Sequence, residues 1–192
     1  MRRIDEYWIE FNPQQEEKSN PFVNACYEFV DSVKGAAVVV FLVFVLAFRV
    51  VGVDGGSMNP TLSNGDWVAV SSTFTDYERG DIVIITQPWE RNVPIIKRII
   101  AVGGDTVDID FDKHEVYVNG ELIDEPYIAQ PTRLEYDVKF PITVEDGRVF
   151  VMGDNRNDSL DSRSSKIGTV DERYIFGKAI FRIVPAGEWK IY

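Results

Sequence analysis

Hydrophobic residues are distributed unevenly along the chain, with one long apolar run near its start and short apolar segments after it. Residues 36–48 are uninterrupted apolar positions, and past a single Arg49 the apolar character continues to Val53. An α-helix rises 1.5 Å per residue, so these 18 residues would span roughly 27 Å, about the hydrocarbon thickness of a bilayer. A helix in a water-soluble core would carry a polar face, which this run lacks. The pattern therefore predicts a single transmembrane helix over residues 35–53.

The charges around this segment predict its orientation. The cations that precede the apolar run are Arg2, Arg3, Lys18 and Lys34, whereas Arg49 is the nearby cation after it. Because cations beside a transmembrane helix are retained in the cytoplasm, we expect a cytoplasmic N-terminus and residues 54–192 outside. A cleaved signal peptide is disfavoured, because the apolar run begins about 35 residues into the chain and no small-x-small cleavage site follows it.

Residues 1–34 are polar, and we interpret them as a loosely ordered cytoplasmic tail. They contain Pro13 and Pro21 and a polar run between these two prolines. The apolar residues between Phe22 and Val30 would also fit a short amphipathic helix. Of the two interpretations we favour the tail.

From residue 54 onwards, short apolar segments are bounded by turn residues, which is the pattern of β-strands. Strong helix patterns are absent from this part. Asn119–Gly120, between two such segments, is typical of a type I′ hairpin turn. The segments that predict strands are 67–70, 81–86, 94–102, 115–118, 121–123, 134–140, 148–152 and 174–184. The sequence therefore predicts a mainly β fold, with a β-rich body of residues 54–192 on one N-terminal transmembrane helix.

The composition limits the chemistry that this body can perform. Asp and Glu total 31 against 20 for Lys and Arg, a net charge of −11, so no basic surface is available to neutralise the phosphates of a nucleic acid. The single cysteine, Cys26, excludes an internal disulfide, and together with the single histidine, His114, it excludes metal sites built from Cys and His. We therefore expect no metal, no cofactor and no nucleic-acid partner. A Ser-His-Asp triad would depend on His114 alone.

Two clusters of candidate catalytic residues interrupt the apolar pattern. Ser57 follows Gly55 and Gly56, which permit a tight backbone path, although most serines beside glycines are plain loop residues. Lys97 and Arg98 interrupt an apolar strand, and strand alternation sends them to opposite faces, so we expect one of them to point toward the core. A buried lysine has a lowered pKa, as a neutral amine acting as a general base near pH 7 requires. The simpler alternative is an edge strand with both cations in solvent.

A third cluster is the polar loop of residues 153–163, which follows the apolar segment 149–152. Its composition also fits an Asx-rich surface turn or a calcium loop. The spacing of Asp154, Asp158 and Asp161 differs from that of an EF-hand. Two arginines among the acids favour a salt-bridged scaffold over a metal cage.

Together, and in this order after one membrane helix, these clusters resemble the sequence elements of bacterial type I signal peptidases. The elements are S-M-x-P-T-L, G-D-x-V-x-V, R-G-D-I-V, K-R-I-x-A-x-x-G-D and G-D-N-R-x-x-S-x-D-S-R. They match, in chain order, residues 57–62, 65–70, 79–83, 97–105 and 153–163. Each element alone is weak evidence, whereas the combination is highly specific and covers most of the β-rich body.

The resemblance implies a Ser-Lys dyad, in which Ser57 is the nucleophile and Lys97 the general base. It further implies that Ser159 hydrogen-bonds and orients the lysine. The backbone N–H of Ser57 would supply one oxyanion donor. Some members place a second donor, a serine, two residues before the nucleophile, where this chain has Gly55 as Gram-positive members do.

The implied supporting residues lie in the polar loop of residues 153–163. Asp161 and Arg163 would form a structural ion pair behind the site, and Asp154 would support the loop. His114 lies outside every matched element, and we interpret it as an ordinary strand residue. The residues from about 106 to 147 would be a small insertion without a catalytic role.

The function that the resemblance implies is that of a membrane-bound serine endopeptidase. It would cleave signal peptides from secreted preproteins after small-x-small sites such as A-x-A, at the plasma membrane, with the preprotein and membrane lipid as partners. A non-catalytic membrane-tethered β-domain, or a pilus-assembly relative, is the alternative, but it would lack Ser57 or Lys97. A repressor-type Ser-Lys protease would have a DNA-binding domain and no membrane span.

Overall fold

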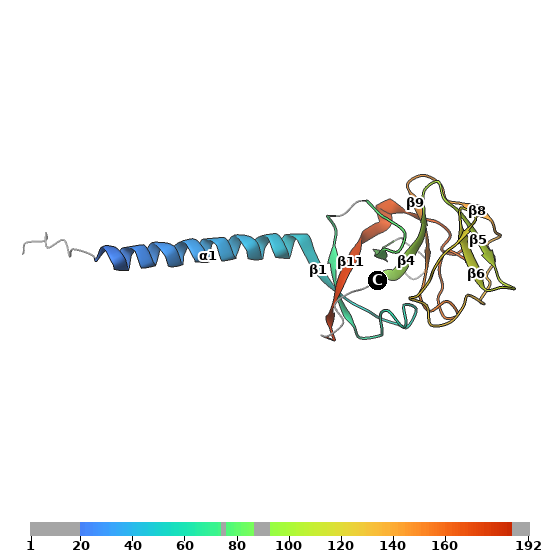
Figure 1. The fold of residues 1–192 in the computed structure, drawn as a ribbon, viewed down its shortest axis with the longest axis horizontal. Coiled ribbons are helices and arrows are strands. Elements are labelled where there is room, and N and C mark those ends of the chain that lie inside the picture. The colour runs from blue at the N-terminus through green and yellow to red at the C-terminus, as the bar shows by residue number, and fades with distance from the viewer. Residues whose placement is uncertain (1–19, 74–75, 87–92, 186–192) are drawn as a thin grey trace, which may run out of the picture. The chain divides into compact units, whose positions relative to one another are not determined.

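The computed structural model describes residues 20–73, 76–86 and 93–185 (Figure 1). The chain divides into two compact units, residues 1–43 and 44–192, and each is described by itself. The first unit is helical where it is described, and in the described part of the second the regular elements are strands, apart from the end of that helix and one 3₁₀ turn. The mainly β fold expected from the sequence is confirmed, but the strand expected over residues 134–140 is wrong, because these residues form an irregular connection.

Helix α1 spans Pro21–Ala47. It begins after Asn20, whose Oδ1 accepts a 3.1 Å hydrogen bond from the Phe22 backbone N–H, as an N-cap residue does. Pro21 suits the first turn, because an N–H at that position would have no partner within the helix. The interpretation of residues 1–34 as a loosely ordered tail is therefore wrong from Pro21 onward.

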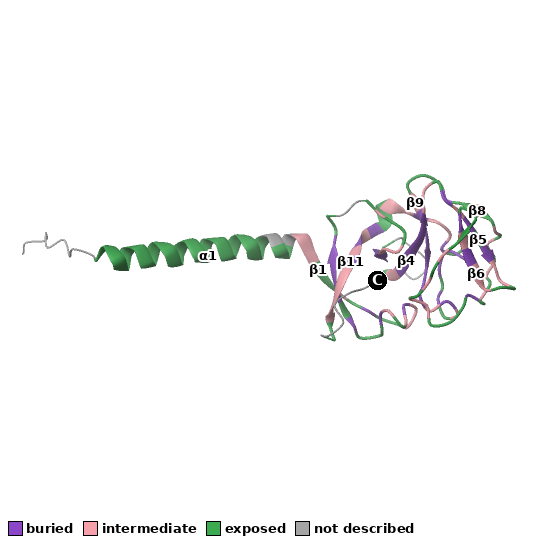
Figure 2. Ribbon diagram, viewed as in Figure 1, coloured by how far each residue is buried: buried purple, intermediate pink, exposed green. Residues whose placement is uncertain are grey.

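The described side chains of α1 are exposed along nearly its whole length (Figure 2). They include large apolar residues, and Val39, Val40 and Phe41 are 60%, 65% and 65% exposed. Measured by length and hydropathy, none of the helices in residues 20–73, 76–86 and 93–185 qualifies as a membrane-crossing segment.

Strand β1, Phe48–Gly52, directly follows the helix and corrects the expected helical range of 35–53. It pairs in antiparallel register with β2, Trp67–Ser71, from Phe48 opposite Ser71 to Gly52 opposite Trp67. Val50 and Val51 are β-branched and favour an extended backbone. The apolar run therefore serves two structures, a helix as far as Ala47 and then a strand.

The larger sheet has seven antiparallel strands in the order β1-β2-β11-β3-β4-β9-β10. Its remaining strands are β3 (Ile82–Ile85), β4 (Ile95–Val102), β9 (Arg148–Met152), β10 (Val170–Asp171) and β11 (Ile175–Val184). A 3₁₀ turn, η1 (Glu172–Tyr174), connects β10 to β11. Strand β4 lies between β3 and β9, so its backbone is hydrogen-bonded on both sides and its side chains are rigidly placed.

A smaller sheet has four strands in the order β7-β6-β5-β8. They are β5 (Thr106–Asp110), β6 (Glu115–Val118), β7 (Glu121–Leu122) and β8 (Ile142–Thr143). The turn from β6 to β7 is the expected hairpin, because Asn119 and Gly120 both have positive φ, at 56° and 80°.

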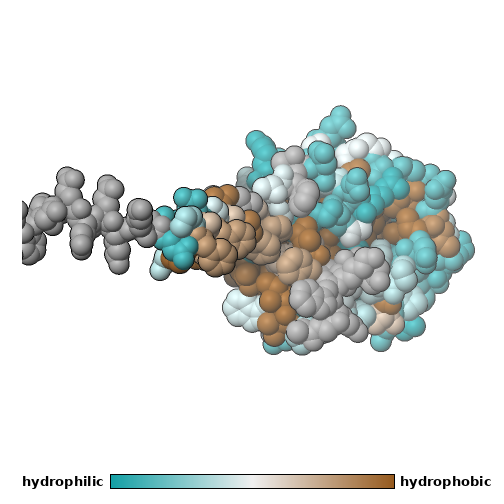
Figure 3. Space-filling view, turned by 60° about the vertical axis from the view of Figure 1, so that its left-hand side comes forward, coloured by the Kyte–Doolittle hydropathy of each residue, from teal (hydrophilic) through white to brown (hydrophobic). Residues whose placement is uncertain are grey.

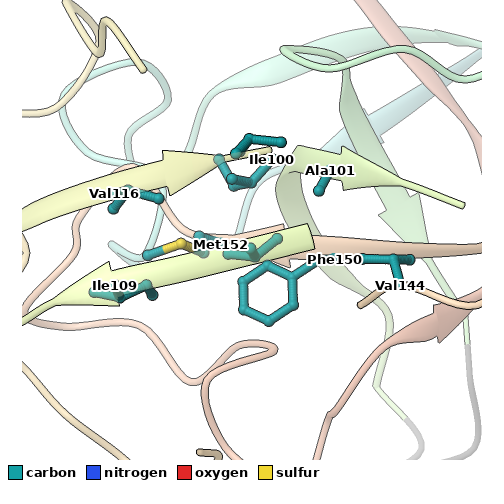
Figure 4. Close-up of a cluster of buried hydrophobic side chains, with 9 residues drawn as sticks. Ile100, Ala101, Ile109, Val116, Val144, Phe150 and Met152 are labelled. Carbon is teal, nitrogen blue, oxygen red and sulfur yellow. The ribbon is translucent and has the colours of Figure 1, made fainter. Parts of the chain in front are cut away.

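The two sheets share a hydrophobic core. Figure 4 shows Ile100 from β4, Ile109 from β5 and Phe150 from β9 in one buried cluster. Other apolar side chains of this unit stay exposed, among them Val50, Trp67 and Val184 on the adjacent strands β1, β2 and β11. Figure 3 shows apolar and hydrophilic residues intermingled on the visible face. The shared core anchors β4, which carries Lys97, and β9, which leads into the polar loop of residues 153–163.

Candidate active site

Lys97 lies in the middle of β4, and its side chain is buried, with 3% of the residue exposed. Its Nζ donates a 2.8 Å hydrogen bond to Ser57 Oγ and a 2.9 Å hydrogen bond to the Ile96 carbonyl oxygen. The two residues of the expected dyad therefore meet, although 40 positions separate them in the chain. The Ile96 carbonyl is a partner that the sequence did not indicate.

The surroundings of Lys97 favour the neutral amine. Burial lowers the pKa of Lys97 from 10.5 to about 8, while the charges of Asp161 and Asp154 raise this pKa and that of Arg163 lowers it. Among the described residues, no carboxylate forms an ion pair with Lys97. An amine with this pKa is partly deprotonated near neutral pH and can accept a proton.

Ser57 is presented by a loop that folds back on itself after β1. The backbone N–H groups of Val53 and Gly65 bond across the loop, and the Gly55 N–H donates to Asn64 Oδ1 at 2.9 Å. Gly55 has a φ of 97°, which a residue with a side chain rarely adopts. Gly55 thus lets the chain make the turn that brings Ser57 to β4.

The polar loop of residues 153–163 binds the loop of residues 53–66 directly, and we call the latter the nucleophile loop because Ser57 is the predicted nucleophile. The Asn155 backbone N–H donates to the Ser57 carbonyl oxygen at 3.0 Å, and Asn155 Nδ2 donates to the Gly56 carbonyl at 3.1 Å. A Cβ on Gly153 would lie 2.5 Å from the Ser57 carbonyl oxygen and 2.2 Å from Ser159 Oγ. Glycine is therefore required there for the two loops to approach this closely.

Ser159 is buried against Gly153, with 3% of the residue exposed. Its Oγ has no hydrogen-bond partner within the part of the chain that the structure describes. The expected hydrogen bond between Ser159 and Lys97 is thus not formed in this structure, where Lys97 instead bonds Ser57 and Ile96. The orienting role of Ser159 stays a prediction.

Asp161 and Arg163 form a fully buried ion pair. Arg163 Nε donates to Asp161 Oδ1 at 2.8 Å, and Arg163 Nη2 donates to Oδ2 at 2.9 Å. The same Oδ2 accepts the Gly153 backbone N–H at 3.0 Å. The pair therefore closes the polar loop and holds Gly153 beside the nucleophile.

Arg98 is buried as well, with 1% exposed, so both cations of β4 point inward rather than one of them. Arg98 Nε and Nη2 donate to the two oxygens of Asp154 at 2.8 and 2.7 Å. Asp154 Oδ2 also accepts a 2.5 Å hydrogen bond from Thr61 Oγ1, in the nucleophile loop. This fork is why a second charged side chain is tolerated in the interior. The hydrogen bonds of Asp154 thus connect β4, the polar loop and the nucleophile loop.

No group of three or more His, Cys, Asp or Glu residues in the described ranges could hold a metal ion. His114 lies in the turn between β5 and β6 of the smaller sheet, with a φ of 63°, so its interpretation as an ordinary strand residue is wrong. Ser57 and Lys97 contact each other at the larger sheet. His114 and the Ser57–Lys97 contact are therefore associated with different sheets.

Comparison with known proteins places the chain beside signal peptidases. The family described as signal peptidase, peptidase S26, matches residues 26–184. Signal peptidase I of Bacillus licheniformis is 38% identical over 184 residues, which cover 90% of this chain and 96% of the relative. Signal peptidase I S of Bacillus subtilis is 35% identical over 174 residues, covering 85% and 91%. A crystal structure of a signal peptidase I from Enterococcus faecalis, 31% identical, covers 54% of this chain and 96% of its own, with a TM-score of 0.43.

Proposed function

The chain belongs to the signal peptidase family S26, as a bacterial type I serine peptidase that removes signal peptides from preproteins, and we propose that Ser57 and Lys97 perform the cleavage. Ser57 is the nucleophile and Lys97 is the general base. The observation that carries this assignment is the 2.8 Å separation of Lys97 Nζ and Ser57 Oγ in a buried setting.

In the first step, Ser57 Oγ attacks the carbonyl carbon of the scissile peptide bond while neutral Lys97 Nζ takes the hydroxyl proton. The backbone N–H of Ser57 donates to the oxyanion that develops on the carbonyl. Lys97 then returns the proton to the leaving amine, which becomes the N-terminus of the mature protein. The signal peptide is left as an ester on Ser57.

In the second step, Lys97 takes a proton from water as the water oxygen attacks the ester carbonyl. The signal peptide departs with a new carboxyl terminus, and Ser57 recovers its proton from Lys97. Because the protonated amine is inactive as a base, the rate should rise with pH through about 8, the pKa that burial gives Lys97.

The other residues of the site act by position. We assign Asp161, Arg163 and Asp154 to holding the polar loop against Ser57, since each is buried and forked to its partner. We assign Ser159 to orienting Lys97. Its buried hydroxyl lies beside the Ser57 carbonyl, as the contacts of Gly153 indicate, and its hydrogen-bonding capacity is unused in the described residues.

For the substrate, we propose cleavage after small residues at the last and third-last positions of the signal peptide, as in A-x-A. For location, we propose the plasma membrane, with residues 1–34 in the cytoplasm and the catalytic domain, including β1 and the segment 106–147, outside. The anchor is the apolar segment that begins at residue 35. Its exposed apolar side chains support this, because hydrocarbon accommodates them far better than water does.

The dyad is tested with the full chain in lipid vesicles and a preprotein bearing an A-x-A site. Ser57→Ala and Lys97→Met should each abolish cleavage while circular dichroism stays that of the folded chain. Lys178→Met is the matched control, because Lys178 is a partly buried lysine of the same sheet that pairs with Asp81. It should cleave normally. A Lys97→Met enzyme with undiminished cleavage would remove the lysine from the mechanism.

A further inference from the structure

Tyr127 contacts two buried arginines that belong to different parts of the site. Its ring centroid is 4.0 Å from Arg98 Cζ and 5.8 Å from Arg156 Cζ. Arg98 follows the base Lys97 in β4, and Arg156 belongs to the polar loop of residues 153–163. Tyr127 itself lies in the long connection from β7 to β8, inside the segment expected to have no catalytic role.

Glu125 completes this contact. It accepts a fork from Arg156, with Nη1 3.0 Å from Oε2 and Nη2 2.5 Å from Oε1. The Tyr127 hydroxyl donates to the same Oε1 at 3.2 Å. The side chain of Arg156 is fully buried, and that of Glu125 is 9% exposed. One short segment thus supplies both a carboxylate and an aromatic face to the buried arginines.

Arg156 and Arg98 each hydrogen-bond a different group near the dyad. Arg156 Nε donates to the Gly153 carbonyl at 3.0 Å, next to the point where Gly153 touches the Ser57 carbonyl. Arg98 forks to Asp154, which also holds Thr61 of the nucleophile loop. Displacement of either guanidinium would therefore move backbone or carboxylate groups that set the Ser57–Lys97 separation.

We propose that Glu125 and Tyr127 are positioning residues for cleavage, which hold Arg98 and Arg156 so that the strand carrying Lys97 and the loop carrying Gly153 keep their places around Ser57. The inference rests on the dyad proposed above. Neither residue touches the reacting atoms, and both act through the arginines.

The physical reason lies in the burial of two like charges near one aromatic ring. A guanidinium over an aromatic face is attracted to the ring quadrupole, most strongly where water is excluded. Asp154 neutralises Arg98 and Glu125 neutralises Arg156, so each cation has one anion and they share one ring. Burial raises the pKa of Tyr127 to about 12, and Glu125 raises it too, so the ring carries no charge of its own in the working range.

The test compares Tyr127→Leu with Tyr127→Phe in the full chain in lipid vesicles, with a preprotein substrate. Tyr127→Leu removes the ring and should lower kcat by about 10- to 100-fold, the effect of a displacement near 1 Å at a catalytic pair. KM should stay within about twofold, because the substrate does not contact Tyr127 under this proposal. Tyr127→Phe keeps the ring and should restore most of kcat, to within about threefold of the wild type.

A pH profile separates positioning from general loss of structure. Asp161, Asp154 and Arg163 are the charged groups that act on Lys97. When Arg98 is loosened, the charge of Asp154 is less compensated and holds the proton on Lys97 more tightly. The rising limb of the rate against pH should therefore move to higher pH in Tyr127→Leu, and a merely destabilised enzyme would keep the limb in place.

Matched controls exist in the smaller sheet. Tyr117 donates its hydroxyl to Glu115, two residues before it, as Tyr127 does to Glu125, but in β6 and away from the arginines. Tyr117→Leu and Glu115→Gln should leave kcat and the pH profile unchanged. If Tyr127→Leu does not fold, Glu125→Gln replaces it, because it keeps the side-chain shape, and about a 10-fold loss in kcat with KM within about twofold is expected.

The outcomes are distinguishable. Folded Tyr127→Leu with wild-type kcat and an unmoved pH limb, or folded Glu125→Gln with wild-type kcat, would overturn the positioning inference and leave the dyad intact. In Tyr127→Leu, a lower kcat without the pH shift, or without rescue by Tyr127→Phe, would equally overturn it. Undiminished cleavage by Lys97→Met would instead refute the dyad, on which the inference rests.

Discussion

The polar loop of residues 153–163 and the smaller sheet each contain an ion pair between a carboxylate and a cation close in sequence, but the first pair is buried and the second is exposed. Asp161 and Arg163 are two positions apart, and both side chains are 0% exposed. Asp110 and Lys113 are three positions apart, and their side chains are 32% and 65% exposed. The first pair is isolated from water and bonded to the backbone of Gly153, whereas the second is solvated. Local spacing therefore says little about what an ion pair does.

Two lysines show the same contrast. Burial lowers the pKa of Lys97 to about 8, whereas the hydrogen bond to Asp110 raises the pKa of Lys113. A buried amine without a paired carboxylate is destabilised in its charged form, and an exposed amine beside a carboxylate is stabilised in it. Burial of Lys97 therefore lowers the stability of the fold while its amine is charged, and it also provides the neutral amine that a base requires. The exposed Lys113 carries no such cost.

The largest effect expected is that of Lys97→Arg on turnover. The guanidinium keeps its proton at every accessible pH, so it cannot act as a base, and kcat should fall by about 10³-fold or more. Raising the pH should recover nothing. Lys113→Arg, the same substitution at the exposed pair, should leave kcat unchanged. Recovery of the Lys97→Arg enzyme at high pH would contradict the assignment.

The next effect concerns the buried ion pair itself. Asp161→Ala leaves Arg163 charged and buried without its anion, which should lower the free energy of unfolding by about 3–5 kcal/mol. Denaturant unfolding of the full chain in detergent measures this. Arg163→Leu made together with Asp161→Ala removes both charges and should recover part of the loss. A single variant as stable as the wild type would show that water reaches the pair.

A smaller effect is predicted for Lys97→Met on stability, with a sign opposite to its effect on activity. Below about pH 8 Lys97 is charged in both the folded and the unfolded chain, so folding includes the full penalty of burying the charge. The methionine variant should then be more stable by about 3 kcal/mol, at about 1.4 kcal/mol per pKa unit. This advantage should shrink as the pH rises from about 8 to 10.5, where the folded amine has lost its proton. Equal midpoints at every pH would contradict the lowered pKa.

The smallest effect is expected at the exposed pair. Lys113→Gln removes a solvated ion pair on the surface, where water replaces the lost partner. The denaturation midpoint should not change beyond measurement error, at low or at high salt. A distinct loss of stability at low salt would mean that the surface pair contributes more than its exposure indicates.

The features that could be read from sequence are those with local causes. The hairpin at Asn119–Gly120 was predictable, because both turn residues adopt positive φ readily. Lys97 stood out because a cation in an apolar strand needs an explanation. The helix start was also marked locally, by Asn20 before Pro21, but the polarity of the surrounding residues favoured a tail.

The features that could not be read depend on distant partners. A continuous apolar run is compatible with a helix and with a strand. Residues Phe48–Gly52 are extended because they pair with β2, which begins at Trp67. Arg98 is buried because Asp154 meets it from 56 positions away, and Arg156 because Glu125 lies 31 positions before it. Nothing within a few residues of either arginine signals that contact.

Gly153 sets a boundary on how this sequence can change. A methyl group, the smallest side chain a mutation can add, would need the space already filled by a backbone carbonyl of the nucleophile loop and by the hydroxyl of Ser159. The backbone oxygen cannot rotate away as a flexible side chain would, so the two loops would have to separate. At this position every replacement is too large, whatever its charge or polarity. The close approach of the two loops therefore depends on the absence of a Cβ at residue 153.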